Sequence, residues 1–322
     1  MGKMDLSIII VNWNSKEYIQ KCIESILVWT SDIKYEIVVI DNASLDGVDK
    51  MLEQYYPQVR FIQSDKNLGF AKANNIAFKK SSGRNVLFLN PDTEIEESAI
   101  GKLCHWLDSL PAAGIVGAKL LNNDRSVQTS CIQAFPTIFN QIFDSNALRR
   151  IFPRAGIWGT APFLSDGNEP SIVDTVSGAC LMIKRVVFEN VRMFSPEYYM
   201  YSEDIDLCFK VKEAGWNTYY IPMAVIIHHG GTSSIQSCEN AFSSVMILES
   251  RWRFFRKTRS HWYCWFYRIA MFFASMLRIG MVLLVWPFYG LRGRASSVGS
   301  VMKKWTARLR WTLGAESWTR NY

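Results

Sequence analysis

The feature that most constrains the fold is a series of short apolar segments in the first 120 residues, each ending in polar residues. Segments of this length suit buried strands, and they cover residues 6–12, 36–40, 59–63 and 85–89. Between them lie helix-like stretches that end near Val28, Tyr56 and Lys80. The alternation predicts an α/β fold with a doubly wound, mostly parallel sheet and right-handed crossovers. We expect a further helix over residues 96–109 and a fifth strand over residues 114–120.

Polar residues follow each of the four strands. The carboxyl ends of neighbouring parallel strands meet at one edge of a sheet, and ligands bind there in open α/β folds. We therefore expect a nucleotide pocket at the edge where four residues converge, namely Asn14, Asp41, Asn67 and Asp92. Ser15 suits the N-cap of the first helix. No glycine-rich dinucleotide motif or P-loop follows the first strand, which disfavours both kinds of site.

Asp92 is the candidate metal ligand. It follows the strand over residues 85–89 after Asn90 and Pro91, and Glu94, Glu96 and Glu97 are expected to open the next helix. A carboxylate at a strand end can hold a hard divalent cation, which in turn holds a diphosphate. The alternative is that Asp92 is only a turn or capping residue, since such short motifs are common.

The second half of the chain is less regular. Residues 121–170 contain several prolines and glycines and predict an irregular excursion, and order returns over residues 172–184. A helix is expected over residues 202–214, with three acids in its first turn that also suit the helix dipole. Strand-like residues follow and end in His228 and His229. Adjacent residues of a strand point to opposite sides, so at most one of these histidines can be a site ligand.

The C-terminal part differs chemically from the rest. The net charge is +7, yet residues 251–322 alone hold fourteen Lys or Arg against one acid, together with seven of the twelve tryptophans. Apolar blocks over residues 269–277 and 279–290 are separated by Arg278 and interrupted by Pro287. We expect interfacial helices on an anionic membrane surface. A membrane span is the alternative, whereas a nucleic-acid surface is disfavoured because the apolar runs are too long.

The cysteines indicate a reducing compartment. Seven are scattered along the chain without a Cys-x-x-Cys pair, which disfavours both a disulfide framework and a zinc site.

Seven motifs in order resemble the family 2 glycosyltransferases of the GT-A fold, above all the bacterial rhamnosyltransferase-like branch. The resemblance covers roughly residues 5–258, and its motifs are Ile9–Asn14, Val39–Ser44, Asn67–Asn75, Leu89–Asp92, Gly178-Ala179, Ser202–Cys208 and His228-x-x-Gly231-x-Ser233. It implies a glycosyltransferase domain over residues 1–258, with a nucleotide-binding half (1–120) and an acceptor half (172–258). Residues 259–322 would form the membrane-associating tail.

The resemblance also implies roles for single residues. Asp41 would read the nucleotide base, and Asp92 with His228 would hold Mg²⁺ or Mn²⁺. The remaining donor-binding residues would be Asn12, Asn14, Asn42, Asn67, Gly69, Asn74 and Asn90. Asp204 would be the general base, and the acceptor would be positioned by Gly178, Ala179 and Glu203. Asn90 stands where the family has the first aspartate of its Asp-x-Asp signature, which leaves the metal one charged ligand fewer.

The function implied is an inverting, metal-dependent sugar transfer in cell-surface polysaccharide synthesis. The donor would be a dTDP- or UDP-sugar, with dTDP-rhamnose favoured, and the acceptor a polyprenyl-diphosphate-linked glycan. The enzyme would work at the cytoplasmic face of the plasma membrane. The alternatives are transfer of another sugar (GlcNAc, galactose or glucose), a sugar-phosphate nucleotidyltransferase, and a non-catalytic membrane adaptor. A nucleotidyltransferase needs a glycine-rich basic loop after the first strand, which Asn12–Ser15 does not supply.

Overall fold

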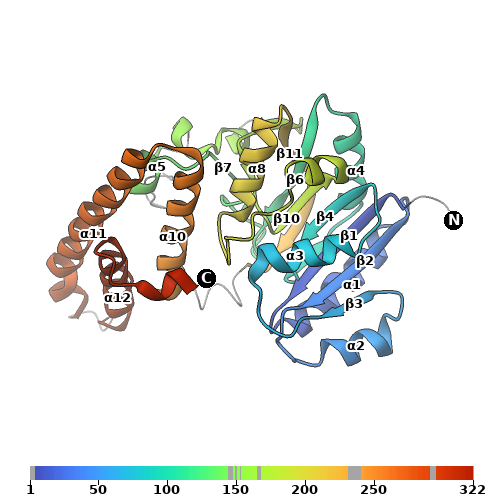
Figure 1. Cartoon of the computed structure of the whole chain (residues 1–322), viewed down its shortest axis with the longest axis horizontal. Helices are drawn as coiled ribbons and strands as arrows, with labels where there is room; N and C mark the ends of the chain where they lie inside the picture. The colour runs from blue at the N-terminus through green and yellow to red at the C-terminus, as the bar shows by residue number, and fades with distance from the viewer. Residues whose placement is uncertain are drawn as a thin grey trace. The chain divides into compact units, whose positions relative to one another are not determined.

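The structure, a computed structural model, describes residues 4–143, 148, 151–152, 154–164, 168–230, 241–290 and 295–321. Its contacts divide the chain into two compact units, whose elements are labelled in Figure 1. The first unit comprises Met1–Phe135, Ile151–Tyr199 and Glu203–Gly230, and the second comprises Pro136–Arg150, Met200–Ser202 and Gly231–Tyr322. Each unit is described on its own below.

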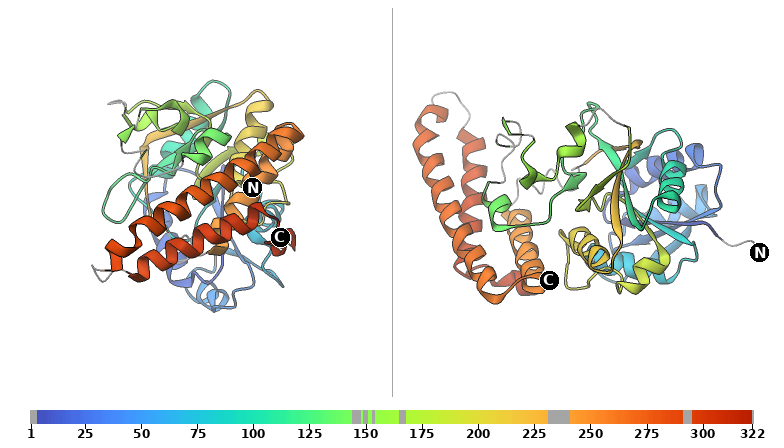
Figure 2. Two further views of the ribbon diagram at one scale, coloured as in Figure 1. Left: turned by 90° about the vertical axis from the view of Figure 1, so that its left-hand side faces the viewer. Right: turned by 90° about the horizontal axis from the view of Figure 1, so that it is seen from above.

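Residues 6–89 form the predicted alternation of strands and helices. In order, the elements are β1 Leu6–Asn12, α1 Lys16–Trp29, β2 Tyr35–Asp41, α2 Val48–Tyr55, β3 Arg60–Gln63, α3 Gly69–Lys79 and β4 Asn85–Leu89. Every residue of β1 and β4 is buried, as expected for strands covered on both faces. Figure 2 shows α3 and α8 on one face of the sheet and α1 and α4 on the other.

The sheet is mixed rather than wholly parallel. Its strand order is β3-β2-β1-β4-β10-β6-β11-β5, and the first four strands in this order are parallel, as predicted. β10 runs antiparallel between β4 and β6. The additional elements of this unit are α4 Ala99–Ser109, β6 Ala113–Leu121, β8 Ser171–Val173, β9 Thr175–Val176, β10 Cys180–Lys184, α7 Arg185–Asn190, α8 Glu203–Glu213 and β11 Asn217–His228.

Two local predictions are wrong. The segment Thr93–Ile95 forms a strand, β5, which pairs antiparallel with β11, and the helix α4 begins only at Ala99. Glu97 has a φ of 48°, which is left-handed, so a helix cannot begin at Glu96. Ser15 does occupy the N-cap of α1, but its hydroxyl donates to the carbonyl of Trp13 instead of capping the helix.

The irregular excursion contains only short elements where it is described. A two-stranded sheet pairs β7 Ile132–Gln133 with β9, and two 3-10 turns follow at Gly156–Trp158 and Ala161–Leu164. The strand-like segments before His228 prove to be one long strand, β11. Its register shifts between Ile221 and Val225, where a bulge interrupts the pairing with β6.

The second unit is helical. It contains α5 Ile138–Ile142, α10 Ala241–Thr258, α11 His261–Gly290, α12 Ala295–Thr312 and the turn Ser317–Asn321. The two apolar blocks of the tail form one continuous helix, α11, which is one of the two arrangements expected for them. Arg278 is accommodated because its guanidinium lies 5.2 Å from the ring of Trp305 on α12. Figure 2 shows α11 and α12 running side by side.

Candidate active site

The predicted edge of the sheet exists. β2, β1 and β4 are neighbours, and their register places Asn12 beside Asp41 and Ile10 beside Leu89. The residues after Leu89 therefore leave the sheet at the same edge as Asn12 and Asp41. This edge carries two polar clusters, one around Asp41 and one around the turn Asn90–Asp92.

Asp41 is fully buried, and both of its carboxylate oxygens accept hydrogen bonds. Asn12 Nδ2 donates to Oδ1 over 2.7 Å, and Gln63 Nε2 donates to Oδ2 over 2.9 Å; the Ser44 hydroxyl donates as well. Burial opposes ionisation, but the hydrogen bonds from Ser44, Gln63 and Asn12 outweigh it and lower the pKa of Asp41. Gln63 was not predicted, although it ends β3 and the same strand-end pattern points to it.

Asn42 and Asn67 join the end of β2 to the start of α3. Asn42 Nδ2 donates to Asn67 Oδ1 over 2.8 Å, and Asn42 Oδ1 accepts from the backbone N–H of Leu68 over 2.8 Å. Gly69 follows with a φ of +76°, and a Cβ there would lie 2.3 Å from the carbonyl oxygen of Tyr199. Only glycine fits this position, because the backbone is left-handed and the neighbouring chain is too close.

Asn14 and Asn74, which were also predicted to bind the donor substrate, make different contacts from Asn42 and Asn67. Asn14 is exposed and has a left-handed φ of 53°. Asn74 is buried, and its Nδ2 donates to the carbonyl of Phe70 in its own helix, so a role toward a nucleotide stays a prediction. The unpredicted Asn75 holds the backbone of Phe194 with both its amide nitrogen and its amide oxygen. Sequence pattern alone does not distinguish these adjacent asparagines.

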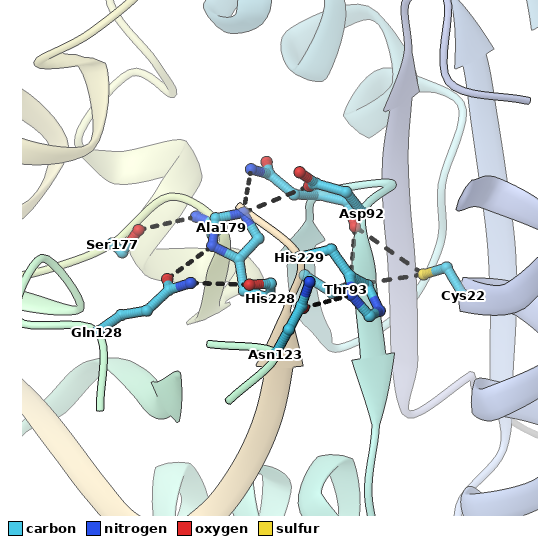
Figure 3. Close-up of polar contacts among 10 residues, drawn as sticks. Cys22, Asp92, Thr93, Asn123, Gln128, Ser177, Ala179, His228 and His229 are labelled. Carbon is cyan, nitrogen blue, oxygen red and sulfur yellow. Dashed lines mark hydrogen bonds and ion pairs between the residues drawn. The ribbon is translucent and has the colours of Figure 1, made fainter. Parts of the chain in front are cut away.

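The second cluster brings His228 against the turn Asn90–Asp92 (Figure 3). His228 Nε2 lies 3.3 Å from Asp92 Oδ1 and 3.4 Å from Asn90 Nδ2. On the other side of the ring, His228 Nδ1 lies 2.8 Å from Gln128 Oε1. The side chains of Asp92 and His228 are only 9% and 15% exposed. The structure thus brings together the two predicted metal ligands; Gly231 and Ser233 of the same motif lie outside the described residues.

A divalent cation fits between Asp92 and His228. Neighbouring ligands of a Mg²⁺ ion with bonds of about 2.0–2.1 Å are about 3 Å apart, close to the observed 3.3 Å. Among the residues that the structure describes, no group of three or more His, Cys, Asp or Glu side chains is arranged to hold a metal. A Mg²⁺ or Mn²⁺ ion here would therefore take its other ligands from water and from phosphate, as is usual for Mg²⁺.

Two neighbours of this turn direct their side chains to other partners as well, namely Thr93 and Glu94. Burial raises the pKa of Cys22 to about 12, so it stays a neutral thiol beside Thr93. His229 Nε2 lies 2.7 Å from Glu94 Oε1, and its Nδ1 lies 2.7 Å from Asn123 Oδ1. The two adjacent histidines therefore face different partners, which confirms that at most one of them is directed at Asp92.

Asp204 is tied to the same turn through two backbone hydrogen bonds. Its Oδ2 accepts from the N–H of Gly178 over 3.0 Å. One residue along the chain, the carbonyl of Ala179 accepts from the N–H of Asn90 over 2.9 Å. The dipeptide Gly178-Ala179 thus bridges the carboxylate of Asp204 and the turn Asn90–Asp92. The adjacent Glu203 is buried, whereas Asp204 is partly exposed.

A third acid of α8 supports the loop that precedes the helix. Asp206 is buried and accepts hydrogen bonds from Ser195 Oγ over 2.5 Å and from Tyr198 Oη over 3.3 Å. Lys210 Nζ lies 3.6 Å from the same carboxylate. Asp206 therefore anchors this loop, while Asp204 points to Gly178. The helix dipole alone does not account for this division of roles.

Comparisons with known proteins identify the family of the chain. A sequence model described as glycosyl transferase family 2 matches residues 7–192. N-acetylglucosaminyl-diphospho-decaprenol L-rhamnosyltransferase of Mycobacterium tuberculosis is 29% identical over 242 residues, which cover 71% of this chain and 77% of the relative. Rhamnosyltransferase WbbL of Escherichia coli K12 is 26% identical over 261 residues, covering 78% and 93%.

A solved structure shares the fold. Mannosyltransferase PcManGT from Pyrobaculum calidifontis, in complex with GDP-Man and Mn²⁺, superposes with a TM-score of 0.56 at 15% identity. The match covers 97% of this chain and 88% of that one. At this identity the likeness is one of fold, a mixed α/β arrangement of the GT-A type.

Proposed function

Since the chain belongs to glycosyl transferase family 2, we propose that it is an inverting, metal-dependent enzyme that moves rhamnose from dTDP-rhamnose to a polyprenyl-diphosphate-linked glycan. Family membership makes the chain a glycosyltransferase, so a nucleotidyltransferase and a non-catalytic adaptor no longer compete. The finer assignment of sugar and acceptor is supported by two relatives that are named rhamnosyltransferases, one of them for a diphospho-decaprenol substrate.

The observation that carries the proposal is the bridge formed by Gly178-Ala179. It fixes the carboxylate of Asp204 and the turn bearing Asp92 to consecutive residues of one backbone segment. A sugar transfer needs a base for the acceptor hydroxyl and a charged partner for the leaving diphosphate, within one substrate length of each other. Asp204 and Asp92 would fill these two roles from either side of the segment that precedes β10.

Asp204 would take the proton of the acceptor hydroxyl as its oxygen attacks the anomeric carbon. The N–H of Gly178 holds Oδ2, and the N–H of Ile205 holds Oδ1 over 2.8 Å. These bonds orient the carboxylate and leave each oxygen further lone pairs for a substrate hydroxyl. Inversion follows if the hydroxyl approaches from the face opposite the diphosphate.

Asp92 and His228 would hold Mg²⁺ or Mn²⁺, and the bound ion would supply positive charge for the diphosphate as it leaves. Asn90 replaces a carboxylate, and its Nδ2 instead lies against His228. The charge of the protein ligands is therefore low, which favours an ion that arrives with the nucleotide and shares its phosphates.

Asp41 shapes the nucleotide side of the pocket. Its oxygens already accept from Asn12, Ser44 and Gln63, so its first effect is to hold the ends of three strands together. A base N–H would have to approach a carboxylate that these groups already position.

Titration of dTDP, UDP and GDP into the protein with Mn²⁺ tests which nucleotide carries the donor sugar. We expect dTDP to bind most tightly. Tighter binding of UDP or GDP would contradict dTDP-rhamnose as the donor.

The helical unit would bring the enzyme to its lipid-linked acceptor. Among the described residues, one stretch, His261–Leu284 of α11, is long and apolar enough to cross a membrane, with a mean hydropathy of 1.6. Most of its large exposed side chains recur at helical spacing on one face, Met281 being the exception. They are Trp262, Trp265, Phe266, Ile269, Phe273, Met276, Leu277, Leu283 and Leu284, and we call them the apolar face of α11.

The opposite face of α11 is committed to protein. Tyr267, Met271 and Ser275 are buried, and Arg268 donates to the carbonyls of Trp311 and Thr312 at the end of α12. A helix packed on one side, with an arginine engaged there, suits a position along the membrane surface better than a span. Burying Arg268 at the bilayer centre would cost about 2.5–3.5 kcal/mol on insertion scales.

Exposed positive charge next to this face suits an anionic membrane. Arg256, Lys257 and Arg259 are exposed immediately before α11, and each basic residue near an anionic surface contributes about 1 kcal/mol. The apolar face runs from Trp262 to Leu284, about 33 Å at the helical rise. We propose that this face lies in the headgroup region of the cytoplasmic leaflet, as a monotopic attachment.

A further inference from the structure

The ring of His228 contacts Gln128, a residue of the irregular excursion, on the side away from Asp92. Gln128 Nε2 lies 2.7 Å from the backbone carbonyl of His228, and Gln128 Oε1 lies 2.8 Å from His228 Nδ1. One side chain thus contacts both the backbone and the ring of the same histidine (Figure 3). No sequence motif marks this glutamine.

These two contacts decide which ring nitrogen carries the proton. A backbone carbonyl can only accept a hydrogen bond, so the amide nitrogen of Gln128 must face it. The amide oxygen then faces His228 Nδ1, and an oxygen can only accept, so Nδ1 must carry hydrogen. In the neutral ring Nε2 is therefore bare, and its lone pair points toward Asp92 and Asn90.

An unprotonated Nε2 beside a carboxylate is suited to binding a cation. Nε2 and Asp92 Oδ1, 3.3 Å apart, would repel each other as two lone pairs unless a positive charge lies between them. Metal-bound histidines commonly donate their other N–H to an oxygen acceptor, which fixes the tautomer and ring orientation. Gln128 Oε1 occupies the position of that acceptor.

The backbone around Gln128 holds it in place. Its N–H donates to the carbonyl of Leu120 at the end of β6 over 2.9 Å, and its carbonyl accepts from the N–H of Cys131 over 3.0 Å. Gly230 leaves room for it, since a Cβ there would lie 3.0 Å from Gln128 Nε2. The irregular excursion, for which the sequence predicts no role, therefore holds the side chain of Gln128 at a fixed position.

We propose that Gln128 is a positioning residue that fixes His228 as the Nδ1–H tautomer and so keeps Nε2 available to the divalent cation. The part that concerns the cation rests on the proposed function, whereas the tautomer follows from the contacts alone. Without Gln128, the proton would move to Nε2, because there it can be donated to the carboxylate of Asp92. A cation would then have to displace that proton.

The test is nitrogen NMR of the His228 ring in the full-length, metal-free protein, followed by Mn²⁺ titration. We expect the Nδ1–H tautomer in the wild type and a shift to Nε2–H in Gln128→Leu. The Mn²⁺ concentration that half-broadens the His228 signals should rise about 10–100-fold in this variant. Asn123→Leu, which removes the equivalent partner of His229, is the matched control and should change neither result for His228.

Gly230→Ala provides a second perturbation without removing a polar group, because its Cβ would lie 3.0 Å from Gln128 Nε2 and 3.4 Å from His228 Nδ1 and so crowd the contact between them. We expect a smaller shift in the same direction. An Nε2–H ring in the wild type, or equal Mn²⁺ broadening in the wild type and Gln128→Leu, would overturn the proposal. An Nδ1–H ring that Mn²⁺ does not broaden would support the positioning by Gln128 while contradicting the metal role of His228 in the proposed function.

Discussion

The two units of this chain use polar and apolar residues in opposite ways. In the first unit, polar side chains gather at the edge of a buried sheet and contact one another, as Asp41 does with Asn12 and Gln63. In the second unit, large apolar side chains stay exposed on α11, while Arg268 and Arg278 pack over tryptophans on its other side. The difference suggests that the first unit performs the chemistry and the second determines where it happens.

The contacts of α10 with the rest of the second unit limit how the tail can be studied. A cut after residue 258 would leave α10 without its partners, because Glu249 accepts from Trp311 and Arg253 donates to the carbonyl of Thr319. Phe254 and Phe255 of α10 are fully buried. Substitutions on the exposed face of α11 therefore separate attachment from folding better than a truncation does.

The largest effect is expected at Asp204. Asp204→Asn keeps the shape and the bond from Gly178 but cannot take a proton, so sugar transfer should fall by about 10²–10⁴-fold with donor binding little changed. Glu213→Gln, at the exposed end of the same helix, is the control and should retain the wild-type activity. Wild-type turnover in Asp204→Asn would show that another residue is the base.

The next largest effect should come from the apolar face of α11. Replacing Trp262, Phe266, Phe273 and Leu277 by serine removes side chains that are each more than 60% exposed. Because burial of one such side chain contributes about 1.5–3 kcal/mol, binding to anionic vesicles should weaken by at least about 10²-fold. Hydrolysis of the donor without acceptor should stay unchanged, since the first unit is untouched.

Val28→Ser, which removes an exposed apolar side chain of α1 in the first unit, is the control for vesicle binding. High salt should weaken attachment of the wild type without abolishing it, because the apolar contribution is not screened. Equal co-sedimentation of the wild type and the fourfold variant would contradict a role for this face in membrane attachment.

Asp92→Ala should weaken the Mn²⁺-dependent binding of nucleoside diphosphate by at least about tenfold. The fold should survive, because the residue lies in a turn beyond the end of β4 rather than within the sheet. Calorimetry with and without Mn²⁺ measures both effects. Metal-dependent binding as tight as in the wild type would exclude Asp92 as a ligand.

The smallest effect concerns stability. Asp41→Asn keeps one acceptor oxygen but leaves the donors to the other oxygen without their acceptor, so it should lower the free energy of unfolding of the first unit by about 1–3 kcal/mol at neutral pH. Since the pKa of Asp41 is lowered in the folded state, its contribution is present above the unfolded pKa of about 3.9 and is lost as pH falls through the folded value. Urea unfolding at a series of pH values, followed by amide exchange in β1 and β2, measures this. The free energies of unfolding of the wild type and Asp41→Asn should become equal in acid.

The sequence predicts those parts of the fold and site that depend on local pattern. Strand ends placed Asp41 and Asp92 at one edge, because apolar runs and their polar termini are visible in the chain itself. β5 was missed because its pairing with β11 is non-local, and the left-handed φ of Glu97 cannot be read from its residue type. The packing of α11 against α12 could not be predicted either, because the contact between Arg278 and Trp305 joins separate helices.

The residues that support the site could not be predicted from the sequence either, because their contacts are also non-local. Gln128 and Asn123 lie in an excursion without periodicity, and only the folded chain brings them to His228 and His229. Gln63 is different, since it ends β3 and could have been found with the other strand ends. Local pattern thus identified the groups proposed for the chemistry but not those that orient them.

The most direct test of the proposed metal-dependent transfer is an assay of the full-length protein. It measures sugar transfer to membrane-extracted lipid-linked glycans from a panel of radiolabelled nucleotide sugars, with and without EDTA. We predict that label from dTDP-rhamnose enters the lipid fraction, that EDTA abolishes this transfer, and that added Mn²⁺ or Mg²⁺ restores it. Transfer at the same rate in EDTA would contradict the metal-dependent mechanism built on Asp92 and His228.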